Sequence, residues 1–342
     1  MLLASLLLLG CAPVPAQHDC DLAGPHVVVG TSDFASGALA AVTLDGDEVC
    51  VADRLVSTGP DAVVRVTDHH TWVVNRTGSD TLLAYEHGDY ATPALEVVVA
   101  PGGNAHDLVA HEGQLFVALY DEPRVLVLDL DGVPVGEVDL SPHADADGLP
   151  EVDALVVTDA GLFASLQRLD RDDGWRGTTG EVVQIDVDTL QVIGSWATGP
   201  NPRLARHPDG RRLVALTGHY FEADGALEII DPSEPSVSEE VLHEQGVRVD
   251  LGVLADDVVL ATAFEVGGDS LIARWQADEL VPLRTSPAWF ADALAVSEGV
   301  VVASRQGFGG VGDGELLWVD DDGVQSFATG FALDPFSLAW VP

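Results

Sequence analysis

The chain has 342 residues, of which 47% are hydrophobic, so it is long enough and apolar enough to bury a sizeable core. It has 56 acidic residues but only 15 basic ones, all of them arginine, so the formal net charge is -41. Such a surface repels phosphate backbones and anionic headgroups, which argues against nucleic acid as a partner and favours cations, basic proteins or polyamines. The same charge also suits a plain solvated, salt-tolerant surface.

The chain begins with an apolar segment that is too short to cross a membrane as a helix. It ends in Leu8-Leu9-Gly10-Cys11. This run resembles the lipobox of bacterial lipoproteins, in which an aliphatic and a small residue precede a cysteine that is acylated. The resemblance implies cleavage before Cys11, a lipid on its thiol and, because Ala12 follows, sorting to the outer membrane. The absence of Lys or Arg before the apolar run departs from that pattern, and an ordinary secretory signal is the alternative.

Three segments are therefore expected: a signal peptide over 1–10, a lipidated N-terminus and tether over 11–25, and a folded domain over 26–342. On this interpretation the protein is exported and anchored by its lipid, facing the periplasm or the cell surface. An exported compartment is oxidising, so Cys20 and Cys50 are expected to form a disulfide. Two buried free thiols are the alternative.

Beyond the tether the sequence predicts β-strands rather than helices. Short β-branched runs recur, each bounded by Gly, Asp, Asn or Pro, which is typical of strands separated by tight turns. One phrase returns along the chain: a polar residue, an apolar run, a turn and a second apolar run. Its occurrences begin at Asp61, Asp107, Asp153, Arg203, Asp250 and Asp292, between 42 and 50 residues apart. Four strands in such a period indicate one blade of a β-propeller.

The apolar end of the chain fits the same repeat. Ser337 follows Asp292 by 45 residues, in register with the earlier starts, yet only one strand remains. The three strands that would complete its blade stand at the N-terminus, within residues 26–60. We therefore predict an all-β, seven-bladed β-propeller with four-stranded blades, closed into a ring by pairing of the C-terminal strand with the N-terminal blade. Closure removes the open edges of a sheet. A misassigned blade would make the number six or eight.

The repeat resembles the seven-bladed propellers of the YVTN/YncE-like group and, more loosely, WD40-like and lactonase-type propellers. The stretch GEVVQIDVDTLQVIGSWATGPNPRLARHPDGRRLVALTG carries the likeness, because a strand ending in Asp, a Thr-Leu turn, a second strand and Gly-x-x-Pro lead into the next blade. The resemblance covers about residues 26–342. It implies a binding or scaffold protein of an exported compartment rather than a particular activity.

The aligned repeat starts are the first candidate site. The innermost strand of each blade lines the central channel, so these side chains are expected to meet at one mouth of it: Asp61, Asp107, Asp153, Arg203, Asp250 and Asp292. Carboxylates held close together have raised pKa values or recruit a cation, and calcium suits several oxygen ligands. The alternative is structural, because an aspartate before a strand often accepts backbone N–H groups, and repetition across blades is what such a role predicts.

A second candidate site is the acidic segment 141–153. Asp145 and Asp147, followed by Gly148, resemble the beginning of a calcium loop, with Glu151 and Asp153 beyond them. The predicted ligands are Asp145, Asp147 and Asp153, and the cofactor would be calcium. The segment lacks the third Asp or Asn and the twelfth-position Glu of an EF-hand loop, so an exposed acidic turn is the alternative.

Three long loops form the third candidate site. They cover residues 167–180, 217–225 and 304–314, each between the second and third strands of a blade, and such connections emerge on one side of a propeller. Long loops on a rigid scaffold often carry binding sites. The residues expected to line this face are Trp175, Arg171, Arg176, Tyr220, Phe221 and Phe308. Merely variable loops are the alternative.

No G-x-S-x-G elbow, H-E-x-x-H motif or dinucleotide fingerprint occurs in a fitting context, so no catalytic residue is assigned. We predict an exported, lipid-anchored monomer that binds a protein or polymer ligand through its loops, without catalysis. The alternative is a metal-assisted, lactonase-like hydrolase at the acidic channel mouth, which requires His, Glu or Arg to converge with the aspartates. A surface protein whose acidic shell only supports solubility is a third possibility.

Overall fold

The computed structural model describes residues 20–45, 48–207, 209–219, 224–234, 239–243, 248–255, 258–264, 269–276, 279–296, 299–306, 314–320 and 322–342. The predicted lipidation site and three of the predicted binding residues lie outside these ranges: Cys11, Tyr220, Phe221 and Phe308. Apart from one short 3-10 helix, η1 (Ser141–His143), the regular elements within the described ranges are all β-strands. In the same ranges no helix is long and apolar enough to cross a membrane.

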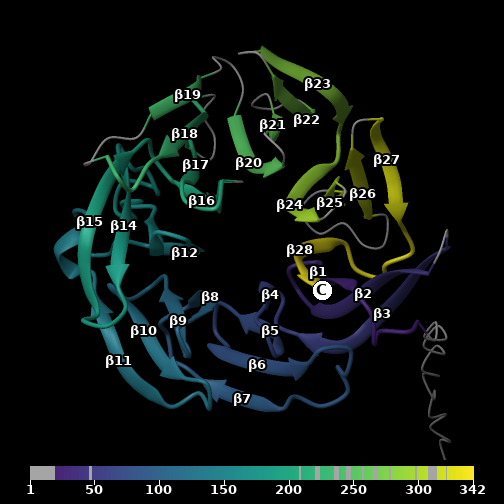
Figure 1. Cartoon of the computed structure of the whole chain (residues 1–342), viewed down its shortest axis with the longest axis horizontal. Helices are drawn as coiled ribbons and strands as arrows, with labels where there is room; N and C mark the ends of the chain where they lie inside the picture. Colours follow the sequence, from purple (N-terminus) through teal and green to yellow (C-terminus); the bar gives the residue numbers. More distant parts are fainter. Residues whose placement is uncertain are drawn as a thin grey trace, which may run out of the picture.

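Within the described ranges the strands form seven four-stranded antiparallel sheets, which surround a common centre like the blades of a propeller (Figure 1). In six of these sheets the four strands follow one another along the chain. They are β4 (Ala62–Val66), β5 (His70–Asn75), β6 (Thr81–Glu86), β7 (Leu95–Val98); β8 (Ala105–His111), β9 (Gln114–Leu119), β10 (Arg124–Asp129), β11 (Pro134–Asp139); β12 (Val152–Thr158), β13 (Gly161–Leu166), β14 (Gly180–Asp186), β15 (Gln191–Thr198); β16 (Arg203–Arg206), β17 (Leu213–Thr217), β18 (Ala226–Ile230), β19 (Glu239–His243); β20 (Arg248–Ala255), β21 (Val258–Phe264), β22 (Ser270–Gln276), β23 (Glu279–Ser286); and β24 (Trp289–Val296), β25 (Gly299–Arg305), β26 (Glu315–Asp320), β27 (Gly323–Ala328). The prediction of an all-β propeller with four-stranded antiparallel blades is confirmed.

The remaining sheet combines both ends of the folded chain. Its order is β28-β1-β2-β3, with β28 (Pro335–Val341), β1 (His26–Ser32), β2 (Gly37–Asp45) and β3 (Glu48–Thr58). In register, His26 lies opposite Val341 and Gly30 lies opposite Ser337. Leu338 and Val341 are only 5% and 3% exposed, so the apolar end of the chain is buried as the innermost strand of this sheet (Figure 1).

The hydrophobic core lies between neighbouring sheets. One cluster joins Val74 and Leu82 of the β4–β7 sheet to Leu108 and Val117 of the β8–β11 sheet. Further clusters fill the equivalent spaces on both sides of the β28-β1-β2-β3 sheet. The second strand of a blade is therefore buried along most of its length, as in β9, where every residue after Gln114 is buried, because both of its faces are covered.

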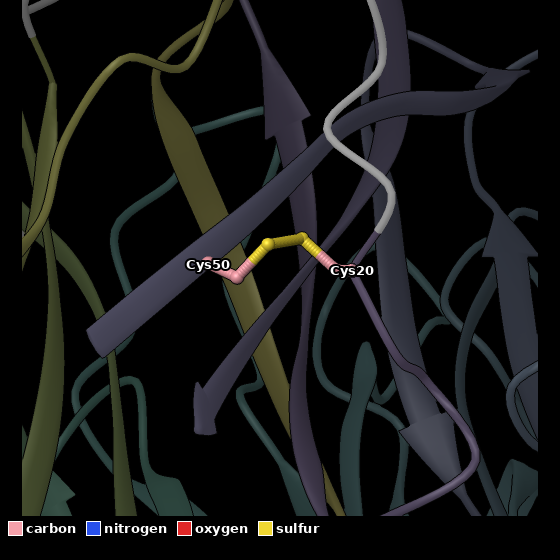
Figure 2. Close-up of a disulfide and its surroundings, with 2 residues drawn as sticks. All are labelled: Cys20 and Cys50. Atoms are coloured by element: carbon pink, nitrogen blue, oxygen red, sulfur yellow. A yellow bond between two sulfur atoms is a disulfide. The ribbon is translucent and has the colours of Figure 1, made fainter. Parts of the chain in front are cut away.

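A disulfide joins the entering chain to the first sheet, as the sequence predicted. Cys20, just before β1, is bonded to Cys50 of β3, and Figure 2 shows the bond linking the incoming segment to this strand. The bond closes a loop with a sequence separation of 30 residues. It limits the freedom of the N-terminal segment in the unfolded chain and so favours the folded state.

Replacing both cysteines by serine should lower the free energy of unfolding by about 3 kcal/mol, because the unfolded chain then regains the entropy that the closed loop removes. Urea unfolding of the double variant and of the oxidised protein measures the difference. The oxidised protein should lose the same stability when a reductant is added, whereas the double variant should not respond. A reductant effect of equal size in both proteins contradicts this account.

Candidate functional site

One side of the propeller carries the connections that bear the candidate residues. In an antiparallel blade, the link between the second and third strands lies at the same end as the start of the first strand. The segments 33–36, 76–80, 120–123 and 167–179 therefore share one side with the links between blades, including 140–151. We call this side the loop face.

Two of the aspartates predicted for the channel mouth are structural. Asp107 is 2% exposed, and its carboxylate accepts hydrogen bonds from the backbone N–H of Leu108 and, in the next blade, of Leu155, both at 2.8 Å. Asp292 does the same for Ala293 at 2.8 Å and for Leu338 in the next blade at 2.7 Å. These carboxylates fasten the innermost strand of one blade to that of the next. This supports the structural alternative for these two positions.

The other channel-mouth residues do not form one acidic ring. Asp61 pairs with Arg76 at 2.6 Å, while Asp153 pairs with His106. Burial by itself would raise the pKa of Asp153, but the hydrogen bond with His106 and the nearby Arg203 hold that pKa below its usual value. Burial does raise the pKa of the Asp292 carboxyl, against the opposing charge of Arg65. Asp250 lies on β20, and its side chain is outside the described part of the structure.

Arg65 compensates the buried charge within the channel. Its Nε donates to the carboxylate of Asp107 at 2.5 Å, from the neighbouring inner strand β4. The side chain of Arg65 is about one-third exposed (33%), whereas that of Asp107 is almost fully buried (3%). The predicted acidic channel mouth is therefore partly neutralised, because arginines at 65, 76 and 203 lie among its carboxylates.

A histidine sits at the centre of this polar network. The Nε2 atom of His106 lies 3.0 Å from the guanidinium of Arg76, and its Nδ1 atom lies 3.1 Å from the carbonyl oxygen and 3.2 Å from the carboxylate of Asp153. Arginine can only donate, so Nε2 accepts, and Nδ1 carries the proton that it donates to Asp153. The lone pair of His106 Nε2 is therefore already used by Arg76.

Stacked rings and guanidinium groups continue from this network across the loop face. Arg171 lies over the ring of Trp175 at 4.9 Å and over that of Tyr120 at 5.6 Å, and Tyr120 stacks on His106 at 4.5 Å between centroids. On the other side, Arg76 and Arg305 both lie 5.7 Å from the ring of Phe336. Arg305 also covers two further rings, at 4.5 Å and 5.2 Å, those of Phe34 and Trp289. We call these residues the cation–aromatic series: Trp175, Arg171, Tyr120, His106, Arg76, Phe336, Arg305, Phe34 and Trp289.

The series is mostly covered, and its exposed end is Trp175. Arg305 is fully buried and Tyr120 is 8% exposed, whereas Trp175 is 45% exposed. Arg171 is held by carboxylates of Asp121 at 2.6 Å and Glu151 at 3.0 Å. The series therefore acts as a rigid support that joins several blades and presents one aromatic side chain to solvent.

Three carboxylates come together beneath the Trp175 loop, but they are not the three that the sequence predicted. Asp145, Asp147 and Glu151 have oxygen atoms within 4.8 Å of one another. Asp153, the predicted third ligand, lies instead in the network of His106. The physical reason is local: the backbone turns back at Glu151, where φ is 46°, and Asp153 then lies on β12, facing the channel. A cation held by this group would have Glu151, rather than Asp153, as its third ligand.

Both carboxylate oxygens of Asp147 and of Glu151 already have donors. Asp147 accepts from the backbone N–H of Leu149 and Arg171, at 2.9 Å and 3.0 Å. Glu151, which is fully buried, accepts from the backbone N–H of Leu169 at 3.1 Å and from the side chain of Arg171. Asp147 and Glu151 thus hold the loop that carries Trp175 through hydrogen bonds to its backbone and to Arg171.

Glu151 should make stability depend on pH. Burial raises the pKa of its carboxyl to about 7, even though the hydrogen bond with Arg171 opposes the shift. The unfolded chain releases this proton near pH 4.5, so the folded state binds more protons between these values. The free energy of unfolding should therefore fall as the pH rises from about 4.5 to about 7, by about 2 to 3 kcal/mol from this residue.

Urea unfolding at pH 4.5, 6 and 8 tests this on the wild type and on Glu151→Gln, which keeps the shape without the titration. The wild type should lose more stability than the variant over this range. Parallel pH profiles of the two proteins contradict the assignment.

Of the predicted loop residues, the structure describes Trp175, Arg171 and Arg176. Trp175 and Arg176 are exposed, while Arg171 is half-buried between two rings. Arg76, Tyr120 and Phe336 were missed. Arg76 and Tyr120 each directly follow the second strand of their blade, β5 and β9, so aligning the repeats on that strand end could have found them.

No protein-family model and no curated protein match the sequence. Solved structures do match. A candidate 6-phosphogluconolactonase from Bacteroides fragilis has a TM-score of 0.67 at 13% identity, covering 93% of this chain and 98% of the other. A second candidate 6-phosphogluconolactonase, from Bacteroides uniformis, has a TM-score of 0.66 at 13% identity, covering 93% and 99%. Hydrazine synthase from Kuenenia stuttgartiensis has a TM-score of 0.63 at 13% identity, covering 82% and 91%. At these identities the likeness shows a β-propeller fold alone.

Proposed function

We propose that the chain is an exported, lipid-anchored, closed seven-bladed propeller of the YVTN/YncE-like kind, which binds a protein or polymer ligand as a monomer through its loop face, without catalysis. The observation that carries the binding proposal is Trp175, 45% exposed on a loop fixed from below by Arg171 and Glu151. A large aromatic side chain that is already immobilised loses little entropy on binding, which is typical of interface anchors. The lipobox-like run ending at Cys11 supports the anchoring part.

Two substitutions test the two parts separately. Cys11→Ser in the full chain should move the protein from the membrane fraction to the soluble fraction of its cells, since no lipid can then be attached. Trp175→Ala in the soluble chain from residue 20 should remove signals from a binding screen of peptides and glycans. Ile193→Ala is the matched control, because Ile193 is 59% exposed on β15 and lies outside the cation–aromatic series. If the wild type and Trp175→Ala give the same binding signals in this screen, the binding proposal is contradicted.

A lactonase-like hydrolase is the second candidate, because His106 and Arg76 do converge with Asp61 and Asp153 at the channel mouth. Two of the similar folds are candidate lactonases by description. A histidine that acts as a base needs a free lone pair, however, and that of His106 Nε2 accepts from Arg76. We therefore rank binding first. Hydrolysis of sugar lactones by the wild type that is lost in His106→Ala would reverse the ranking.

A further inference from the structure

The turn around Trp175 has a fixed shape. The backbone N–H of Asp170 donates to the carbonyl of Arg176 at 3.1 Å, and that of Trp175 donates to the carbonyl of Asp170 at 2.9 Å. Gly174 and Trp175 both have left-handed backbone angles, with φ of 71° and 65°. One face of the indole rests on Arg171. The other side of the ring is therefore offered to solvent by a closed turn rather than by a loose loop.

The charges around this ring are predominantly negative. Asp172 and Asp173 are exposed in the same turn, next to Asp170. Asp121 and Asp147, from two other loops, lie against Arg171 beneath it. Arg171 does not balance this set, because its guanidinium is already paired with Asp121 and Glu151.

An exposed aromatic ring with carboxylates in the same turn fits a cationic side chain. A guanidinium or ammonium group gains from the π-face of tryptophan and from charge-assisted hydrogen bonds to carboxylates. The net charge of -41 would steer a basic partner towards the protein and repel an acidic polymer.

From these observations we infer that Trp175, with Asp172 and Asp173, forms the docking surface for a basic segment of a polypeptide partner, with an arginine or lysine side chain seated on the indole. This inference rests on the proposed binding function and narrows its ligand to one chemical class.

The test uses a decapeptide with four arginines, the same peptide with glutamates in their place, and a neutral version. Calorimetry at 0.15 M salt measures binding to the chain from residue 20. At this ionic strength charges act over about 8 Å, so local carboxylates dominate over the net charge. The wild type should bind the arginine peptide only. Trp175→Ala and the double variant Asp172→Asn with Asp173→Asn should each weaken binding by about threefold to tenfold.

The matched control is the double variant Asp131→Asn with Asp188→Asn. These two exposed aspartates lie in turns between third and fourth strands, on the side opposite the loop face, and the change in net charge is the same. Binding should be unchanged in this control. If both double variants weaken the peptide equally, the attraction is one of net charge, and the inference is wrong. If the arginine peptide does not bind to the wild type, but Trp175→Ala abolishes binding of a glycan or acidic peptide, the proposed binding function stands without this inference. If no ligand depends on Trp175, both are wrong.

Discussion

Deleting residues 335–342 should leave the chain without a cooperative folded state. The deletion removes β28, which pairs with β1 from His26 to Thr31 and lies innermost in its sheet. The edge of β1 would then expose backbone groups and the buried side chains of Val27 and Val29. Circular dichroism and thermal unfolding measure the effect, and we expect no sigmoidal transition.

Two milder changes control for this deletion. Removing only Pro342, which is exposed and follows β28, should leave the melting temperature unchanged. Leu338→Ala, at a side chain that is 5% exposed, should lower the free energy of unfolding by about 3 kcal/mol. A deletion variant that melts cooperatively near the wild-type temperature contradicts the role given to β28.

Asp107→Ala should cost about 3 kcal/mol of stability, the largest effect expected from one polar residue here. The substitution leaves the backbone N–H groups of Leu108 and Leu155 without their acceptor and removes the partner of Arg65. Asp107→Asn keeps one acceptor oxygen, so its stability should lie between that of the wild type and that of Asp107→Ala. Chemical unfolding of these variants, with the exposed Asp131→Ala as a control expected within about 0.5 kcal/mol of wild type, provides the measurement. An effect of Asp107→Ala no larger than that of the control would show that the carboxylate does not link the blades.

The repeat allowed most of the fold to be predicted, because blade period, strand length and turn residues are local properties of a sequence. The column of aspartates was also placed correctly at the starts of inner strands. Its role was less predictable. Which N–H group Asp107 or Asp292 reaches depends on how the next blade is staggered, and that is set by packing between sheets rather than by spacing along the chain.

The candidate site was harder to predict for the same reason. Arg76 and Phe336 lie far apart in the sequence, and the pairing of β28 with β1 places Phe336 beside the blade that carries Arg76. The exchange of Asp153 for Glu151 in the acidic group depends on one positive φ angle that residue type does not reveal. The exposed aromatic residue, Trp175, was predicted because a long loop on a regular repeat stands out in the sequence.

Hydrogen exchange with and without the arginine decapeptide tests the central claim most directly, namely that the Trp175 turn is the binding surface. Backbone amides of residues 168–177 and of the underlying segment 145–151 should exchange more slowly when the peptide is present, while the turns that contain Asp131 and Asp188 should be unaffected. Protection confined to those opposite turns, or no change over 168–177 at saturating peptide, would contradict the account.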